Sequence, residues 1–303
     1  MNQLDRETRC KVIAALVEGV SCRAISRMRG IARNTIASLL VEAGAACAEY
    51  QDKALRNLQC KRVQCDEIWS FCYAKDKNVP ADKQGNFGYG SVWTWTALDA
   101  DTKLICSWMV GSRDGGTARE FIQDLASRLA NRIQLTTDGH AAYADAVEIA
   151  FGGEIDYAML SKLYGSDQTP EETRYSPAVC IGTRQQPMSG DPDPKHVSTS
   201  YVERQNLTMR MHMRRFTRLT NAFSKKLENH VAAISLHFMY YNFVRIHQTL
   251  RITPAMAAGV TNRVWEVSDI VALFDSSKAQ KAAASREERT IRSLTNKGPA
   301  LGF

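Results

Sequence analysis

The order of strand-like and helix-like segments between residues 61 and 165 restricts the fold more than any other feature of the sequence. Three segments rich in β-branched and aromatic residues come first: "KRVQCDEIWSFCYAK", "GYGSVWTWTALDADT" and "KLICSWMVGSRDGG". A segment with helical spacing follows, "TAREFIQDLASRLAN", and then a short strand, "RIQLTTDGH". A second helix, "AAYADAVEIAFGG", and a fifth strand, "IDYAMLSKLYG", come next. This alternation predicts an α/β protein in which helices cover the faces of a mixed sheet.

Three strands followed by helix, strand, helix and strand is the order of the RNase H-like fold. We therefore predict an RNase H-like mixed sheet flanked by helices over residues 61–245. A Pro/Gly-rich segment, about residues 166–197, is expected to be irregular, and its length indicates a functional or mobile role. A later helix carries an apolar stripe that should pack on the sheet, at Leu227, Val231, Ile234, Phe238 and Tyr241. The histidines of this region are more typical of structural residues than of metal ligands: His230, His237 and His247.

The first 50 residues have helical spacing and predict a separate all-α domain with a helix-turn-helix unit. Ser21 is a candidate N-cap, and Ser26, Gly30 and Ile36 follow at the spacing of that unit. A small residue lets two helices approach, glycine takes the positive-φ position in the turn, and an aliphatic residue anchors the second helix. A helical bundle without a DNA role would show much of the same pattern. If the unit binds DNA, its contacts to phosphates and base edges would come from Arg27, Arg33, Asn34 and Thr35.

Composition excludes several classes of protein. The 303 residues are 44% hydrophobic and 23% charged, as in soluble globular proteins, and no apolar run reaches the roughly 18 residues of a membrane helix. The N-terminus has acidic residues before its apolar stretch, unlike a secretory signal. The eight cysteines form no C-x-x-C pair, so we expect reduced thiols in a cytoplasmic protein and no structural zinc.

Positive charge is concentrated in one part of the chain. The net charge is +7, and residues 203–226 contain seven basic side chains and a single acid, Glu203. The basic residues are Arg204, Arg210, Arg214, Arg215, Arg218, Lys225 and Lys226. Such a run indicates either a surface for a polyanion or a solvated basic face, and charge alone leaves both open. A second basic stretch, "REERTIRSLTNKG", suggests a loosely ordered tail.

Three carboxylates stand where this fold would bring them together. Asp66 lies in the first predicted strand, Asp138 ends the fourth, and Glu203 lies near the start of a later helix. Each has a plain alternative: Asp138 before glycine can form a turn, Asp66 can be a partnered edge residue, and Glu203 can complete a capping box with Ser200. Glu67 competes with Asp66, but adjacent strand residues face opposite sides, so only one is expected to enter the site.

Three hard oxygen donors at one place predict a site for two Mg²⁺ or Mn²⁺ ions. A pair of such ions activates the attacking oxygen and stabilises the leaving oxygen in phosphoryl transfer. Three acids that converge would therefore suit phosphoryl transfer, whereas each acid alone is weak evidence for it.

The segments "CDEIWSF", "TTDGHAAY" and "STSYVERQNLTMRMHMRRFTRLTNAFSKK" resemble the three acidic blocks of DDE transposases, and most closely those of the insertion-sequence-one type in bacteria and archaea. The segment "YYNFVRIHQTLRITPAMAAG" also resembles the tail of many transposases and integrases. The likeness covers about residues 61–260. The chain departs from some relatives because it lacks a cysteine-based zinc unit before the helix-turn-helix.

This resemblance implies a transposase that binds terminal inverted repeats, cleaves DNA and joins the freed 3′-hydroxyl to target DNA. Asp66, Asp138 and Glu203 would be the catalytic metal ligands. The DNA contacts of the third block would be Arg204, Asn206, Arg210, Arg214 and Arg215, with Arg210 on the same helix face as Glu203. The expected partner is double-stranded DNA, bound by a homodimer or higher oligomer near the nucleoid of a prokaryote, with no nucleotide and no membrane.

The sequence thus predicts three regions: residues 1–50 for DNA recognition, residues 61–245 for catalysis, and residues 246–303 as a C-terminal segment with a basic tail. Two other functions share these features. A nuclease or resolvase on the same fold would use the same acids without joining strands. A helix-turn-helix regulator with an inactive catalytic domain would bind DNA and cleave nothing.

Overall fold

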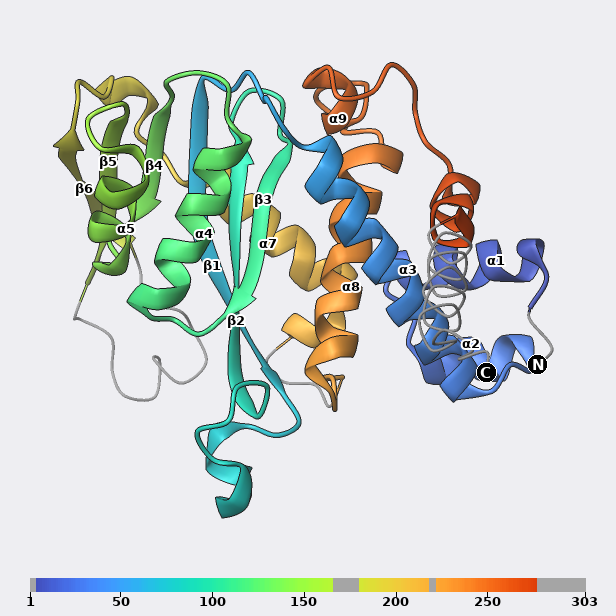
Figure 1. Cartoon of the computed structure of the whole chain (residues 1–303). Coiled ribbons are helices and arrows are strands. Elements are labelled where there is room, and N and C mark those ends of the chain that lie inside the picture. Colours follow the sequence, from blue (N-terminus) through green and yellow to red (C-terminus); the bar gives the residue numbers. More distant parts are fainter. Residues whose placement is uncertain (1–3, 166–179, 218–221, 277–303) are drawn as a thin grey trace, which may run out of the picture.

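The computed structural model describes residues 4–165, 180–217 and 222–276 (Figure 1). A mixed sheet forms the centre of the molecule, with α4 (Gly115–Arg128) and α5 (Ala142–Phe151) on one face and α7 (Ser200–His212) and α8 (Leu227–Met239) on the other. The predicted α/β architecture, a mixed sheet flanked by helices, is therefore confirmed.

The sheet has six strands in the order β3-β2-β1-β4-β5-β6. β1 pairs with β4 in parallel and with β2 antiparallel, and β4 pairs with β5 in parallel. The outer strands, β3 and β6, are antiparallel to their neighbours. The strands are β1 (Arg62–Cys72), β2 (Gly90–Asp99), β3 (Ile105–Gly111), β4 (Gln134–Asp138), β5 (Asp156–Tyr164) and β6 (Cys180–Ser189).

The sixth strand corrects a prediction. Proline and glycine in the segment 166–197 predict an irregular connection, yet its residues 180–189 form β6 along the edge of the sheet. Proline is tolerated on an edge strand, where one row of backbone groups needs no partner, and Pro187 lies in this one. Residues 166–179 lie outside the described part of the chain.

Alternating side chains of the central strand enter two different cores. Ile68 faces α7 and α8, where it joins Val202, Met209 and Phe238. Residues an odd number of positions away face α4 and α5, where Cys65 joins the larger cluster that contains Phe121. This two-residue period is the reason that β1 is buried along most of its length.

The helices expected at the N-terminus are present as α1 (Arg6–Val17), α2 (Cys22–Arg29) and α3 (Arg33–Ala54). Ser21 caps α2 by accepting a 3.1 Å hydrogen bond from the amide of Ala24. Gly30 ends α2 with a φ of 67°, the left-handed conformation that glycine adopts without steric cost. The role of this helical region in DNA binding stays a prediction.

The third of these helices packs directly along α8. A Cβ atom on residue 44 would lie 2.5 Å from the Cα of Ala232, so only glycine allows the two helices to approach this closely. Ser235 donates a 2.7 Å hydrogen bond to the Gly44 carbonyl, and Gln51 donates one of 3.2 Å to the Ser235 carbonyl. The N-terminal helices and the sheet are therefore held together by a buried contact.

The remaining elements are short. A π-helical turn (Tyr240–Val244) extends α8, and α9 (Pro254–Ala257) and a helical segment at residues 267–276 follow. The 3-10 turns are Asp76–Asn78, Ala81–Lys83, Pro194–His196 and Arg214–Phe216. No helix in the described ranges is both long and apolar enough to cross a membrane. The basic stretch at residues 286–298 lies outside the described residues.

The two histidines of α8, His230 and His237, are buried. Nε2 of His230 lies 3.0 Å from the hydroxyl of Ser70 on β1. Burial lowers the pKa of both His230 and His237 to about 3, so both rings are neutral near pH 7. Within the described residues, the group of side chains that could hold a metal contains no histidine.

Candidate active site

Asp66 and Asp138 lie side by side on neighbouring parallel strands. The register of β1 and β4 pairs Cys65 with Thr137, and each aspartate is the next residue of its strand. β4 ends at Asp138, whereas β1 continues for six residues beyond Asp66. The predicted meeting of these two acids follows from this register.

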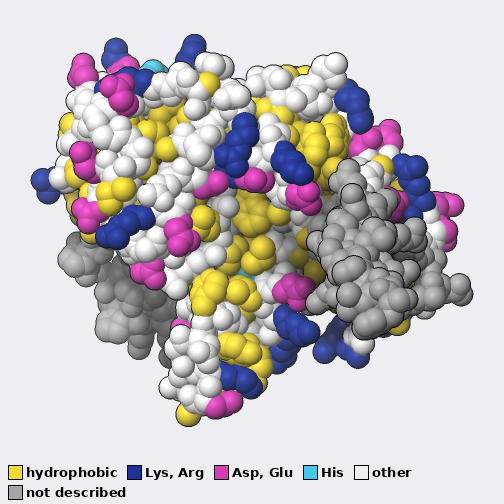
Figure 2. All heavy atoms as spheres, viewed as in Figure 1, with side chains coloured by type: hydrophobic (Ala, Val, Ile, Leu, Met, Phe, Trp, Pro, Cys, Tyr) yellow, Lys and Arg dark blue, Asp and Glu magenta, His cyan; other side chains and the backbone are white. Residues whose placement is uncertain are grey.

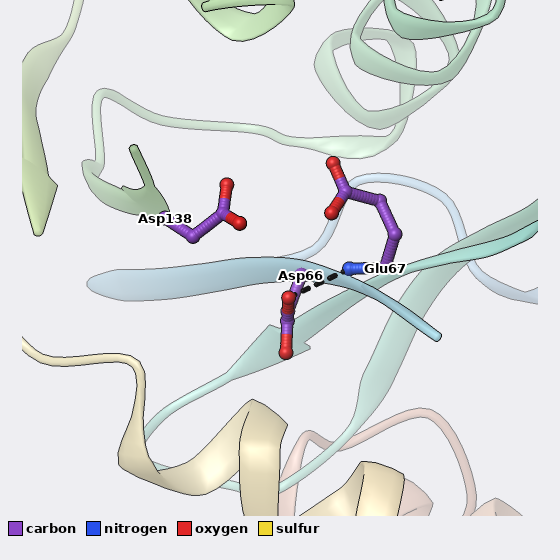
Figure 3. Close-up of side chains that lie close together, drawn as sticks. All are labelled: Asp66, Glu67 and Asp138. Carbon is purple, nitrogen blue, oxygen red and sulfur yellow. Dashed lines mark hydrogen bonds between the residues drawn. The ribbon is translucent and has the colours of Figure 1, made fainter. Parts of the chain in front are cut away.

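A third carboxylate joins them from the other face of β1. One oxygen each of Asp66, Glu67 and Asp138 lies within 4.8 Å of the others, and no other group of three such side chains in the described residues could hold a metal. Figure 3 shows the Asp66 and Glu67 carboxylates on opposite sides of the strand, with Asp138 at the end of β4 turned toward β1.

The prediction that only one of Asp66 and Glu67 can enter the site is therefore wrong. The two side chains do face opposite ways, as strand geometry requires. Asp138 lies at the end of β4, however, and its carboxylate is near those of both Asp66 and Glu67. Alternation therefore places the Asp66 and Glu67 carboxylates on opposite faces of β1 without preventing both from lying near Asp138.

The electrostatics of the cluster favour a bound cation. Burial and the charge of Asp138 raise the pKa of Asp66 to about 7, and the same two causes raise the pKa of Glu67 to about 8. The Glu67 side chain is only 1% exposed, and its Oε1 has no hydrogen-bond partner among the described residues. Crowded carboxylates of this kind are costly unless a positive charge compensates them.

An arginine partly supplies this charge. Arg113, in the loop after β3, places its guanidinium 3.6 Å from Oε2 of Glu67 and 3.6 Å from Oδ2 of Asp138. Its guanidinium also lies 4.9 Å from the centre of the Trp93 ring. Arg113 therefore lies across one side of the cluster, and Asp66 faces the other side of β1.

Glu203 lies on α7 and outside the group of three. Its Oε2 forms an ion pair with Lys162 of β5, and its Oε1 accepts a 2.5 Å hydrogen bond from the Thr199 hydroxyl. The charge of Glu203 nevertheless contributes to the raised pKa of Asp66, so the two carboxylates interact. The structure thus brings Asp66 and Asp138 together and holds Glu203 nearby through a lysine.

The capping box of Ser200 and Glu203, the alternative to a metal-binding role for Glu203, is absent. Thr199, not Ser200, occupies the N-cap of α7, and no side chain accepts a hydrogen bond at that cap. The first amides of α7 are satisfied from the sheet instead, because Gln64 Oε1 accepts hydrogen bonds of 2.9 Å from Tyr201 and 3.1 Å from Val202. A tertiary partner has replaced the local cap, which satisfies the same orphan donors.

A further hydrogen bond ties α7 to the acids. The amide of Asn206 is buried and donates a 2.8 Å hydrogen bond to Oδ2 of Asp66. The sequence predicts that Asn206 contacts DNA, but here its side chain contacts a candidate metal ligand. The helix that carries Glu203 is thereby fixed against the strand that carries Asp66.

The predicted basic contacts differ in accessibility. Arg204, Arg210 and Arg214 are exposed, whereas Arg215 is partly buried and donates a 3.4 Å hydrogen bond to the Ser224 hydroxyl. Burial lowers the pKa of Arg215. At the N-terminus, the end of α2 and the start of α3 expose Arg27, Arg33, Asn34 and Thr35.

The sequence reasoning missed Gln64, Arg113 and Lys162. A signal existed for Lys162, because Leu160 pairs with Asp138 and strand alternation places the second residue after Leu160 on the same face. No comparable signal marks Arg113, which reaches the cluster from a loop.

Comparison with known proteins gives a limited result. No protein-family model matches the chain, and no curated protein matches it. Among solved structures, a cryo-EM structure of the piggyBac transposase synaptic complex with hairpin DNA matches with 11% identity and a TM-score of 0.38, over 100% of this chain and 78% of that one. A crystal structure of the Mos1 strand transfer complex matches with 10% identity and a TM-score of 0.24, over 79% of this chain and 76% of that one. At these TM-scores the likeness does not establish a shared fold.

Proposed function

We propose that the chain is a metal-dependent DNA strand-cleaving and strand-joining enzyme, a DDE transposase with an RNase H-like catalytic domain. One observation carries the proposal: Asp66 and Asp138 lie level on adjacent parallel strands, and α7 is bound to Asp66 through Asn206. Glu203 lies three residues before Asn206 on that helix, and this position supports Glu203 as the third metal ligand of the proposed site.

The residues fit the divalent metals that this chemistry uses. Asp66, Asp138 and Glu203 would hold them, with Glu67 as a fourth carboxylate. Oxygen donors alone, crowded enough to raise two pKa values, suit a hard cation such as Mg²⁺ or Mn²⁺. Two such ions, when bound, supply charge for the attacking and leaving oxygens of phosphoryl transfer.

The protein's own groups orient this site. Asn206 donates to Asp66 and so fixes the direction of its remaining lone pairs. Lys162 holds Glu203 toward the sheet, and Arg113 balances the charge of Glu67 and Asp138. Arg204 and Arg210 are exposed on α7 and can contact phosphates next to the carboxylates.

The finer parts of the proposal concern recognition. We assign binding of terminal inverted repeats to residues 1–50, because α2, which Ser21 caps, and the following α3 expose Arg27, Arg33, Asn34 and Thr35. Residues 61–245 would be catalytic, and residues 246–303 a C-terminal segment. The source would be a prokaryotic insertion sequence of the insertion-sequence-one type, with the enzyme acting as a homodimer or larger assembly on DNA.

A strand-joining assay tests the proposal. The substrate is a short duplex with an exposed 3′-hydroxyl, made from DNA that flanks the reading frame, and the target is a supercoiled plasmid. With Mg²⁺ or Mn²⁺, the chain should link the duplex covalently to the plasmid, and Asp66→Asn should not. Plasmid nicking without joining would instead identify a nuclease, and binding without cleavage a regulator.

A further inference from the structure

An arm extends from the sheet between β1 and β2. We define the arm as residues 73–89, which connect the two longest-paired strands of the molecule. β4 pairs with β1 only as far as Cys65, and β3 pairs with β2 no nearer to the arm than Trp93. The ends of β1 and β2 therefore continue past their neighbours and carry the arm away from the body, as Figure 1 shows.

The arm carries a cluster of aromatic rings and lysines. The rings of Tyr73 and Tyr89 meet edge to face at 5.1 Å, and Nζ of Lys83 lies 5.0 Å and 5.8 Å from their centres. Nζ of Lys225 lies 5.6 Å from the centre of Tyr73 and 5.0 Å from that of Phe223. Figure 2 shows hydrophobic and basic side chains next to one another on this projection.

These rings are not buried in a core. In the cluster, Tyr89 is 38% exposed and Tyr73 and Phe223 are half-buried, and Phe87, elsewhere on the arm, is 50% exposed. Large apolar side chains that gather on a surface mark a binding site more often than a structural need. The cluster therefore presents ring surface to a partner.

Charge identifies the class of that partner. The arm and residues 222–226 hold five lysines against two aspartates, which are Lys75, Lys77, Lys83, Lys225 and Lys226 against Asp76 and Asp82. Asp76 accepts hydrogen bonds from the amide and the hydroxyl of Ser91, at 2.7 Å and 2.5 Å, and so serves the arm's own structure. Lysines between exposed aromatic rings suit a strand of nucleic acid, with phosphates on the lysines and bases on the rings.

The arm is joined to the chain that leaves the Glu203 helix. The amide of Tyr73 donates a 2.8 Å hydrogen bond to the carbonyl of Ser224, next to Lys225. Tyr73 has a φ of 67°, a conformation that costs free energy in a non-glycine residue and persists at sites where the surrounding structure holds it. Arm and segment 222–226 thus form one surface.

The distance from Asp66 to this surface can be expressed as a number of nucleotides. Seven residues separate Asp66 from Tyr73 along extended β1, which is about 23 Å at about 3.3 Å per residue. Successive nucleotides of a stacked strand are about 3.4 Å apart. The surface therefore lies about seven nucleotides from a phosphate held at Asp66.

We propose that the arm and residues 222–226 form a second DNA-binding surface, which stacks unpaired bases about seven nucleotides from the reacting phosphate. This inference rests on the proposed function, because that function places a DNA phosphate at Asp66. Base stacking requires an open base face, so the ligand is single-stranded or locally unpaired DNA rather than a closed duplex.

Fluorescence anisotropy of the full chain with two labelled probes tests the binding. One probe is a 20-nucleotide oligothymidine, and the other is a 30-base-pair duplex. Tyr89→Ala should weaken binding of the oligothymidine about tenfold, because stacking contributes about 1–3 kcal/mol per base, and should leave duplex binding unchanged. Tyr89→Phe keeps the ring and should bind like the wild type. Tyr201→Ala is the matched control, since it removes a 46% exposed ring near Lys103, at the opposite end of β1.

Photocrosslinking tests the placement. A single 5-iodouracil is moved along the strand that carries the 3′-hydroxyl, and crosslinks to the arm should be strongest about seven nucleotides from that end. A joining-competent chain whose Tyr89→Ala variant binds oligothymidine like the wild type would overturn the second surface and leave the proposed function intact. A chain that binds neither probe would overturn both.

Discussion

The side-chain amide of Asn206 on α7 donates a 2.8 Å hydrogen bond to Oδ2 of Asp66 on β1. Asn206 is buried and Asp66 is half-buried, and burial together with Asp138 raises the pKa of Asp66 to about 7. The amide donor opposes this rise, because it stabilises the ionised carboxylate. This hydrogen bond thus couples α7, the helix that carries Glu203, to the protonation state of Asp66.

Asn206→Ala should lower divalent-metal affinity about 10- to 100-fold, because loss of a group that orients a metal ligand typically has this effect. Isothermal titration with Mn²⁺ measures the affinity directly, and a Mg²⁺ titration of strand joining should shift in the same direction. Thr208→Ala, two residues along α7, removes a methyl group and a hydroxyl that bonds to the Arg204 carbonyl, and it serves as the control. Equal Mn²⁺ affinities for Asn206→Ala and the wild type would restrict Asn206 to a packing role.

Glu203→Gln should fold with nearly unchanged melting temperature and lose cleavage and joining by orders of magnitude. Glutamine can still accept the hydrogen bond from Thr199, and the lost ion pair with Lys162 is about one-third exposed, so it contributes about 1 kcal/mol or less. Gln lacks the charge that a hard cation requires. Asp66→Asn and Asp138→Asn should act alike, and the losses should not add. Cleavage by Glu203→Gln at the wild-type rate would remove Glu203 from the active site.

The metal-free chain should lose stability as pH rises from about 4 to about 8. The folded pKa of Asp66 is about 7 and that of Glu67 about 8, against ordinary values of 3.8 and 4.5. Over this interval the folded state binds more protons than the unfolded state, so the free energy of unfolding falls with pH. Glu67→Gln removes one of the two groups, and its melting temperature should exceed that of the wild type at pH 8 in EDTA.

Added Mg²⁺ should raise the wild-type melting temperature at pH 8, because binding to the folded state alone stabilises it. The rise should be smaller for Glu67→Gln if Glu67 takes part in binding. Differential scanning calorimetry at pH 6 and pH 8, with and without Mg²⁺, measures all four conditions. If the melting temperatures of the two proteins changed equally with pH and with Mg²⁺, Glu67 would not be part of a strained carboxylate cluster.

The sequence predicted the parts of this site that depend on strand order and register. Asp66 and Asp138 could be placed together because a parallel pair of strands brings a strand centre and a strand end to the same level. The contacts at the start of α7 could not be predicted in this way, because they depend on partners distant in sequence. The first amides bond to Gln64, and Glu203 pairs with Lys162.

The other features that the sequence did not predict are an edge strand, the position of Glu67 and an arginine in a loop. The strand β6 was missed because its proline is typical of a loop, yet an edge strand tolerates proline. Glu67 was excluded because alternation places it on the opposite face of β1 from Asp66. The alternation holds, but Asp138 at the end of β4 lies near both carboxylates. Arg113 reaches the acids from a loop, and no periodic pattern specifies where a loop side chain points.

Arg210→Ala should weaken binding to duplex DNA and reduce the slope of log affinity against log salt by about one unit, if Arg210 contacts a phosphate. Its melting temperature should change little, since the side chain is exposed. Lys61→Ala is the control, because Lys61 is exposed just before β1, at the opposite end of the sheet from the acids. An unchanged slope for Arg210→Ala would make this residue an ordinary solvated charge.

Recognition of specific DNA by α2 and α3 can be tested without cutting the chain. Removal of residues 1–50 would divide α3 and expose the surface where Gly44 packs against Ala232, so loss of binding by that fragment could reflect unfolding. Point substitutions avoid this difficulty, because Arg33 and Asn34 are exposed at the start of α3.

Arg33→Ala and Asn34→Ala should each relax sequence preference, since a good side-chain contact to a base contributes about 1–3 kcal/mol of discrimination, or about 5- to 150-fold in affinity. Selection from a pool of randomised duplexes measures this preference directly and requires no defined target sequence. The wild type should enrich one motif, and each variant should enrich a shorter or more degenerate one. Lys53→Ala, near the other end of α3 and ion-paired with Glu49 of the same helix, should enrich the wild-type motif. If both variants at the start of α3 enriched the wild-type motif as strongly, these helices would be a structural bundle and end recognition would lie elsewhere in the chain.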